Sequence, residues 1–181
     1  MGPSVKNVMV IGGFLLLALG VIQWSPALAS WPQSPTVSAR VKKLEDIEAI
    51  KTLKHRYIVA IDDVIADPAA SEDFVDLFVD DFVVEYDEFG TFSDKGSLTF
   101  FLENVISPAF SWGFHAAHNP RIVVEGDHAT GEWYFTADAV YAGTTEAVPF
   151  YGRYVDHYVR TCDGWRIQST ILEFDSPPMM E

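Results

Sequence analysis

The chain has 181 residues, of which 49% are hydrophobic and 21% charged, a balance typical of a folded globular protein with a single core. Its formal net charge of −14 at pH 7 argues against binding to nucleic acids, whose phosphates need a basic surface, and against binding to anionic lipid headgroups. The only cysteine, Cys162, leaves no partner for an intramolecular disulfide.

The N-terminal residues 1–29 form a segment of different character. Apolar sequence runs without interruption from Val8 to Ile22, and Ala27 and Ala29 match the A-x-A pattern that signal peptidase reads. We expect a signal peptide cleaved after Ala29, and hence an exported protein, periplasmic or secreted. The alternative is an uncleaved membrane anchor with the domain outside the cytoplasm, although the run is short for a bilayer span, which takes about 20 residues.

Three helices are predicted after a Ser/Pro linker at 30–39. The first begins after Ser38, a candidate N-cap, and ends near Pro68, because apolar residues recur at steps of three and four between them. A short second helix is predicted over 71–81 and a third over 94–107. The third places four apolar residues on one face: Leu98, Phe101, Leu102 and Val105.

The remaining sequence has strand character. Residues 82–93 have strand composition, and alternating apolar segments follow His115, with turns at 126–128 and 162–164. Helices first and long antiparallel strands last predict an α+β fold, in which helices close a pocket over one cone-shaped, strongly curved antiparallel sheet. We expect this domain to span 40–175 and to be followed by a short tail, 176–181.

Three segments of the chain resemble a known family. They are LEDIEAIKTLKHRYIVAID, HAAHNPRIVVEGDHATGEWYF and GRYVDHYVRTCDGWRI. They resemble the SnoaL-like branch of the nuclear transport factor two-like superfamily, which includes polyketide cyclases, scytalone dehydratase and bile acid 7α-dehydratases. The resemblance covers about residues 40 to 174 and implies the curved-sheet fold. It does not determine the reaction, because this fold carries many chemistries and several noncatalytic binding modules.

The resemblance also implies a set of site residues. The dehydratases of this branch use a helix tyrosine, an aspartate five residues later, a tyrosine from the first strand and a histidine that opens an H-x-x-x-N block. The matching residues here are Tyr57, Asp62, Tyr86 and His115. Helix geometry alone leaves Asp62 and Asp63 as alternatives for the carboxylate, and the resemblance favours Asp62.

These side chains suit acid–base catalysis without a cofactor. A histidine facing an apolar pocket is a natural general base, and a carboxylate beside it fixes its tautomer. Tyrosine hydroxyls can donate hydrogen bonds to an enolate or a leaving hydroxyl. We expect dehydration, or else isomerisation or cyclisation, of a small apolar cyclic ketone or alcohol of steroid, terpenoid or polyketide type. The alternative is a noncatalytic module that binds a hydrophobic ligand or mediates dimerisation.

Four further residues are expected to line the pocket: Asn119, Trp133, Phe150 and Tyr154. On an extended strand His115 and Asn119 share one face, while His118 points to the other, so the two histidines are not expected to share a metal. Metal-binding spacings, phosphate loops and nucleophile elbows are not found in the sequence, and we expect neither a metal nor a cofactor. Some of the dehydratases that the chain resembles hold a coenzyme A thioester with an arginine near the last strand. Residues 169–175 offer no basic side chain there, so such a substrate is not expected.

A homodimer is also expected. Apolar residues alternate over 132–141, and members of this family often pair through the open face of their sheet.

Overall fold

The computed structural model describes residues 1–2 and 34–175, and its first element is the long helix α1 (Val37–Ala66). The Thr36 side chain caps this helix by accepting a hydrogen bond from the backbone N–H of Ala39. The expected cap at Ser38 is therefore wrong, and the last residues of the expected linker 30–39 are helical. The expected signal peptide or anchor lies outside the described residues.

The segment 71–81, expected to be one helix, is shared between a helix and a strand. Helix α2 spans only Ser71–Val75, after a 3₁₀ turn at Pro68–Ala70, and strand β1 (Phe78–Tyr86) begins three residues later. Buried and exposed side chains alternate along the second half of β1, as in a strand with one buried face. This alternation favours a strand, although the acidic residues at the start of the segment are typical of a helix N-terminus. The alternating buried residues are Phe82, Val84 and Tyr86.

The third predicted helix contains a π-helical turn. Helix α3 (Lys95–Phe101) continues as a π-helical segment (Leu102–Ile106) and then as the short helix α4 (Ser107–Ala109). A π-turn holds more residues than an α-turn, so the inward face moves to a later position in the sequence. Val105 is exposed, contrary to the expectation, and Ile106 faces the interior cavity instead. The other expected core residues are buried: Leu98, Phe101 and Leu102.

Six strands form one curved sheet in the order β2-β1-β6-β5-β4-β3. The last four are antiparallel neighbours joined by turns that hold Gly126 and Gly164 in left-handed conformations. Strand β1, however, pairs with β6 in parallel, so the expected all-antiparallel sheet is wrong. Helices α3 and α4 separate β1 from the later strands, and β1 therefore joins the sheet without a hairpin. The remaining strands are β2 (Gly90–Phe92), β3 (Phe110–Glu125), β4 (His128–Tyr141), β5 (Ala147–Thr161) and β6 (Gly164–Phe174).

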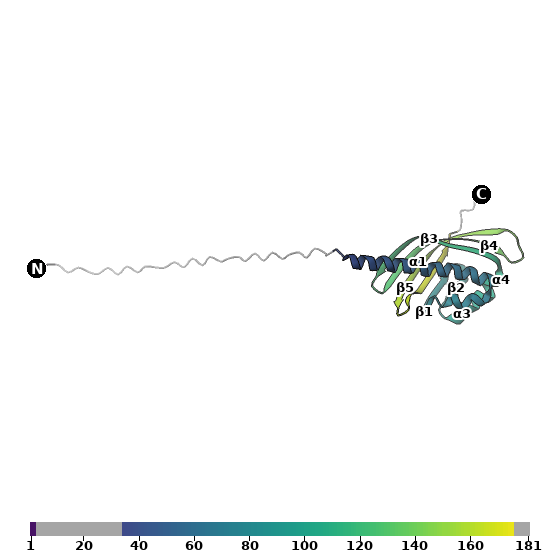
Figure 1. Cartoon of the computed structure of the whole chain (residues 1–181), viewed down its shortest axis with the longest axis horizontal. Helices are drawn as coiled ribbons and strands as arrows, with labels where there is room; N and C mark the ends of the chain where they lie inside the picture. Colours follow the sequence, from purple (N-terminus) through teal and green to yellow (C-terminus); the bar gives the residue numbers. More distant parts are fainter. Residues whose placement is uncertain (3–33, 176–181) are drawn as a thin grey trace. The chain divides into compact units, whose positions relative to one another are not determined.

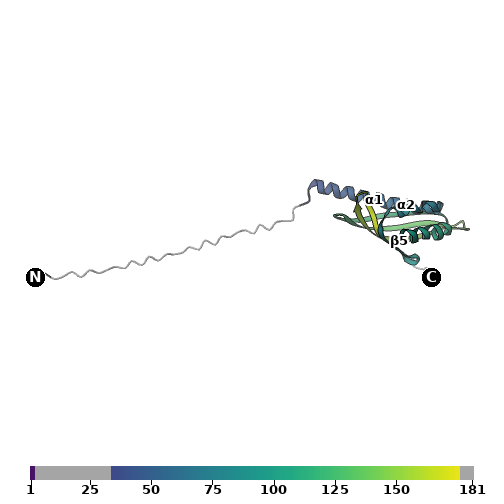
Figure 2. The same cartoon turned by 90° about the horizontal axis from the view of Figure 1, so that it is seen from below.

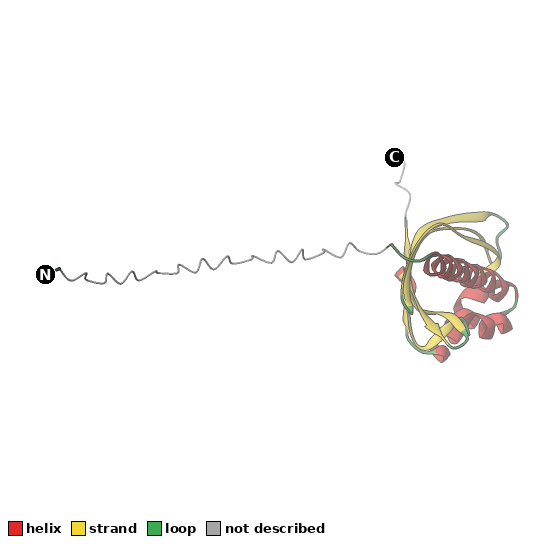
Figure 3. Ribbon diagram, turned by 60° about the vertical axis from the view of Figure 1, so that its left-hand side comes forward, coloured by secondary structure: helices red, strands yellow, loops and turns green. Residues whose placement is uncertain are grey.

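The helices lie inside the curve of the sheet (Figure 3), and α1 runs along the strands for much of its length (Figures 1 and 2). The alternating apolar residues of 132–141 face this interior: Trp133, Phe135, Ala137 and Ala139 are buried. Tyr134, from the same run, is exposed on the opposite face of β4. Three further aromatic residues of the neighbouring strands are also exposed: Trp112, Phe114 and Tyr151.

A buried ion pair fixes the first half of α1 to the sheet. The Asp46 carboxylate, 6% exposed, accepts hydrogen bonds from both terminal nitrogens of Arg160, at 2.8 and 2.7 Å, and from the indole N–H of Trp165 at 3.3 Å. The Arg160 guanidinium also lies over the Trp165 ring, 4.4 Å from its centroid. These donors, the Arg160 guanidinium foremost, hold the pKa of Asp46 well below its usual range. We call this group the Asp46 clamp.

The described residues from Pro35 to Asp175 form one structural unit. Among the helices described between residues 34 and 175, none has the length and hydropathy of a membrane span.

Candidate active site

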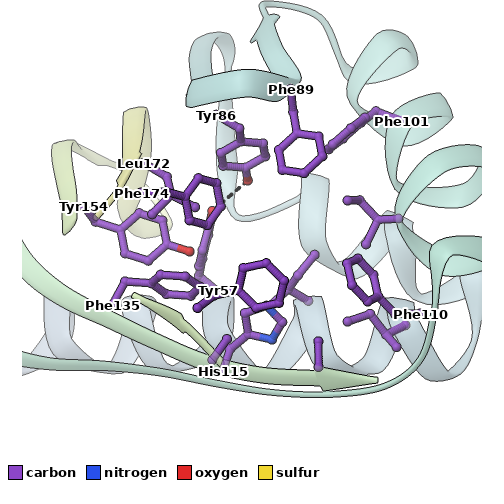
Figure 4. A pocket seen from close by; sticks show the side chains of 16 residues that line it. Tyr57, Tyr86, Phe89, Phe101, Phe110, His115, Phe135, Tyr154, Leu172 and Phe174 are labelled. Carbon is purple, nitrogen blue, oxygen red and sulfur yellow. Dashed lines mark hydrogen bonds between the residues drawn. The ribbon is translucent and has the colours of Figure 1, made fainter. Parts of the chain in front are cut away.

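An apolar cavity of about 90 Å³ lies between the helices and the concave face of the sheet (Figure 4). Its polar groups are the hydroxyls of Tyr57, Tyr86 and Tyr154 and the imidazole of His115. Lysine, arginine and carboxylate side chains are absent from its lining in the part of the chain that the structure describes. Most of the wall is aromatic: Phe89, Phe101, Phe110, Phe135, Phe150 and Phe174.

The Asp62 carboxylate, at the end of α1, holds His115 of β3 by two hydrogen bonds. The imidazole Nδ1 lies 2.6 Å from Oδ1 of Asp62, and the backbone N–H of His115 donates to Oδ2 at 3.2 Å. An ionised carboxylate only accepts hydrogen bonds, so this contact places the proton on Nδ1 and leaves Nε2 as the free base. His115 lines the cavity and Asp62 lies behind it.

Of the two carboxylates that helix geometry left open, Asp62 is the one that contacts His115. Asp63 is exposed, and its backbone carbonyl accepts a hydrogen bond from Asp67 N–H at the end of α1. Gly113 of β3 allows the helix and the strand to approach closely at this point. A Cβ atom there would lie 2.6 Å from Cδ1 of Ile65 and 3.6 Å from Oδ1 of Asp62.

The hydroxyls of Tyr57, from α1, and Tyr86, from the end of β1, lie 2.7 Å apart, as the dashed line in Figure 4 shows. One hydroxyl donates to the other, so one O–H of the pair remains free to donate to a ligand. Burial raises the pKa of Tyr57, Tyr86 and Tyr154 above the ordinary value of a phenol. All three therefore stay protonated, and able to donate, around neutral pH.

The structure places two of the four expected pocket residues elsewhere. Phe150 and Tyr154 line the cavity, but Asn119 and Trp133 do not. Asn119 has a positive φ of 52°, and the pairing of β3 with β4 changes register between His118 and Arg121, which interrupts the alternation of faces. Asparagine is one of the few non-glycine residues that adopt this conformation readily.

Trp133 is buried, but its indole lies away from the cavity. The ring packs against Gly131 and Tyr158, where the missing glycine side chain leaves room for it: a Cβ atom on Gly131 would lie 2.8 Å from the indole nitrogen.

The two histidines of the FHAAHNP stretch face opposite sides of the sheet. His115 faces the cavity, whereas His118 is exposed on the outer surface and stacks on Tyr134, with ring centroids 5.9 Å apart. They cannot bind one metal together. Residues 1–2 and 34–175 contain no group of three or more His, Cys, Asp or Glu side chains arranged to hold a metal ion.

Sequence reasoning missed a buried charge network next to the cavity. Nζ of Lys54, a residue of α1 that is 1% exposed, lies 2.9 and 3.2 Å from the two carboxylate oxygens of the fully buried Asp156. Tyr158 donates to the same carboxylate at 2.6 Å, and Thr170 donates to it as well. Each residue carries a signal in the sequence: Lys54 lies on the apolar stripe of α1, and Asp156 lies on the same face of β5 as the buried Tyr154 and Tyr158. The sequence does not show that the two residues pair.

The comparisons with known proteins agree with this fold. The SnoaL-like domain family matches residues 42–171. No curated protein matches the chain. A solved structure described as a candidate aromatic ring hydroxylase from Novosphingobium aromaticivorans is 26% identical, with a TM-score of 0.66, and the alignment covers 80% of this chain and 94% of that one.

Two other similar structures carry the names of elimination enzymes. One, described as a candidate scytalone dehydratase from Novosphingobium aromaticivorans, is 22% identical, with a TM-score of 0.67 and coverage of 76% of this chain and 89% of that one. Hexachlorocyclohexane dehydrochlorinase LinA-type3 from Novosphingobium barchaimii is 16% identical, with a TM-score of 0.66 and coverage of 76% and 91%. At these identities the likeness concerns the fold. Because the family match spans most of the chain and the fold agrees with it, the protein belongs to the SnoaL-like domain family.

Proposed function

We propose that the protein is a cofactor-free lyase that removes water from a small apolar cyclic alcohol or hydroxyketone. One observation carries this proposal: a carboxylate-held histidine and a hydrogen-bonded tyrosine pair face the same, otherwise apolar, cavity. The names of the structurally similar dehydratase and dehydrochlorinase support it, because both describe eliminations.

The reaction assigns a task to His115, to Asp62 and to the Tyr57–Tyr86 pair. In a hydroxyketone, Nε2 of His115 takes the proton from the carbon between the carbonyl and the hydroxyl-bearing carbon, and Asp62 stabilises the imidazolium that forms. The free O–H of the Tyr57–Tyr86 pair donates to the substrate oxygen that gains negative charge. The electron pair of the broken C–H bond becomes the C=C bond. The leaving hydroxide takes up the proton that His115 received and departs as water. Isomerisation and cyclisation start from the same proton abstraction and are the alternative reactions.

The cavity favours a neutral substrate of modest size. Its described lining has no cationic side chain, which is unsuited to coenzyme A thioesters and to other anionic substrates. Its volume of about 90 Å³ is below the roughly 150 Å³ of a cavity known to take up benzene, so even a single ring requires the aromatic wall to move. A single-ring terpenoid or polyketide-derived compound therefore suits the cavity better than a steroid.

A noncatalytic binding module is the second candidate. The crowding of six phenylalanine rings around a small space favours it, because such a wall can enclose an apolar ligand without any chemistry.

A substrate screen with matched variants separates the two candidates. The protein is incubated with cyclic hydroxyketones and alcohols of terpenoid, aromatic polyketide and steroid type, and loss of water is followed by mass spectrometry. His115→Gln should lower turnover by roughly 10²- to 10⁴-fold, the usual effect of removing a positioned proton-transfer group. His118→Gln, the same change on the outer face of the same strand, should leave turnover nearly intact. Ligands that bind without conversion across the whole panel would support the binding module.

We also propose that the protein is exported. The apolar run from Val8 to Ile22 and the small residues Ala27 and Ala29 support a cleaved signal peptide. N-terminal sequencing of the protein from its native host should give Ser30 as the first residue. An intact Met1 would contradict cleavage and favour the membrane anchor.

A further inference from the structure

The ammonium group of Lys54 lies against the tyrosines of the cavity without entering it. Its Nζ atom is 3.4 Å from the ring centroid of Tyr154 and 4.2 Å from that of Tyr57. The two rings meet edge to face, with centroids 5.6 Å apart. Both tyrosines line the cavity, and Figure 4 shows the Tyr154 hydroxyl pointing into it. The charge therefore sits on the far side of the same rings whose hydroxyls face a ligand.

The Asp156 network holds the ammonium group in this place. Two carboxylate contacts, at 2.9 and 3.2 Å, occupy one side of Nζ, and Tyr158 and Thr170 satisfy the remaining acceptor capacity of Asp156. A buried ion pair of this kind is a weak source of stability, because desolvation offsets much of its attraction. Its position next to the site calls for a different explanation.

A cation over the face of a phenol acts on the hydroxyl of that ring. The positive charge stabilises negative charge that builds up on the phenol oxygen when its O–H donates strongly. The interaction is strong where water is excluded, and Lys54, Tyr57 and Tyr154 are each less than 5% exposed. The positive charge thus acts against burial and against the Asp156 carboxylate, which both raise the pKa of Tyr57 and Tyr154.

We propose that Lys54 is a positioning residue of this site, which orients the rings of Tyr154 and Tyr57 and strengthens their hydroxyls as hydrogen-bond donors toward an oxyanion in the cavity. This inference rests on the proposed function, in which an oxygen of the substrate gains negative charge. It adds Tyr154 to the donors of that oxygen.

Binding of substituted phenols tests the inference without any turnover. Phenol and fluorinated phenols up to pentafluorophenol have similar sizes and increasing acidity, so they present increasing negative charge at one oxygen. In the parent protein their affinity, measured by isothermal titration calorimetry, should rise with acidity. Lys54→Met should lower the affinity for pentafluorophenol by roughly 10-fold. The affinity for toluene, which has no oxygen, should change less than about twofold.

The chain offers a matched control and two safeguards. Lys51→Met removes a lysine one turn earlier on α1 that is half exposed and paired with Glu48, and it should change nothing. Lys54→Met/Asp156→Asn avoids an unpaired buried carboxylate if the single variant does not fold. Tyr154→Phe keeps the ring beside the ammonium but removes the hydroxyl, and it should also flatten the dependence on acidity.

An unchanged dependence in a folded Lys54 variant, or in Tyr154→Phe, overturns the inference. If neither Lys54 variant folds, Tyr154→Phe decides it. The outcome is separate from that of the proposed function. If the protein converts no substrate but its affinity for phenols rises with their acidity in a Lys54-dependent way, this inference stands and the proposed lyase activity is refuted. If the protein is an active dehydratase without this dependence, the proposed function stands and this inference is refuted.

Discussion

The imidazole of His115 and the carboxylate of Asp62 lie 2.6 Å apart, although 53 residues separate them in the chain. The contact predicts one tautomer, with the proton on Nδ1. In ¹⁵N NMR spectra of the neutral form, Nδ1 of His115 should carry the hydrogen and Nε2 should not. Asp62→Asn should mix the two tautomers and lower turnover less than His115→Gln, because the base is misoriented rather than removed. Spectra that show the proton on Nε2 in the parent would contradict this geometry.

Phe89 should limit the size of the ligand that the cavity accepts. Its side chain is 45% exposed, its ring lies 5.7 Å from that of Phe101, and Gly90 follows it with a positive φ of 103°. Phe89→Ala should therefore raise the affinity for 2-naphthol relative to phenol by roughly 10-fold, because it enlarges the cavity. The cost in stability should be small, because the ring is partly exposed. Phe100→Ala, which removes an exposed ring outside the cavity, is the control. An unchanged ratio would show that the wall opens elsewhere.

The Asp46 clamp should stabilise the fold in a pH-dependent way. Because the pKa of Asp46 is depressed in the folded state, its contribution is present above the ordinary value of 3.8 and is lost as the pH falls toward the folded value. Asp46→Asn should lower the free energy of unfolding by about 2 kcal/mol at pH 7. Below pH 3.8 the difference from the parent should shrink by about 1.4 kcal/mol per pH unit. Urea titrations at pH 7 and pH 3 measure both values, and equal differences at the two pH values would refute the assignment.

The outer face of the sheet should mediate homodimerisation. Tyr134 and Tyr151 are each nearly half exposed on neighbouring strands, where solvent contact of large rings is unfavourable. We expect light scattering to show a dimer, and Tyr134→Lys/Tyr151→Lys to give a monomer with an unchanged circular dichroism spectrum. Val83→Lys, at an exposed apolar position on β1, should remain dimeric. A monomeric parent protein at high concentration would exclude the pairing.

The sequence predicts those features of the fold that depend on neighbouring residues. Steps of three and four identify α1, alternation identifies the long strands, and glycines mark the turns at Gly126 and Gly164. The parallel pairing of β1 with β6 could not be predicted in this way, because the partner of a strand is chosen by the closing of the whole sheet.

The residues of the candidate site could likewise be predicted only in part. The resemblance supplied His115 and Asp62, and the structure shows their contact. The position of Asn119 was wrong because one residue in the left-handed conformation changes the face of every residue after it, and no alternation pattern reveals where that occurs. The pairing of Lys54 with Asp156 spans 102 residues and could be found only from the structure.

One partner in each of three polar contacts at or beside the cavity belongs to the same helix, α1. Lys54, Tyr57 and Asp62 all belong to α1, and each bonds to a different strand. Asp46 lies sixteen residues before Asp62, which is about 24 Å along the helix axis. A tilt of about 2.5° around the Asp46 clamp, directed away from β3, would therefore move Asp62 by about 1 Å and stretch its bond to His115 beyond hydrogen-bonding distance. A substitution at Asp46, far from the candidate site, should therefore disturb the contact between Asp62 and His115 as a substitution at either of these two residues would.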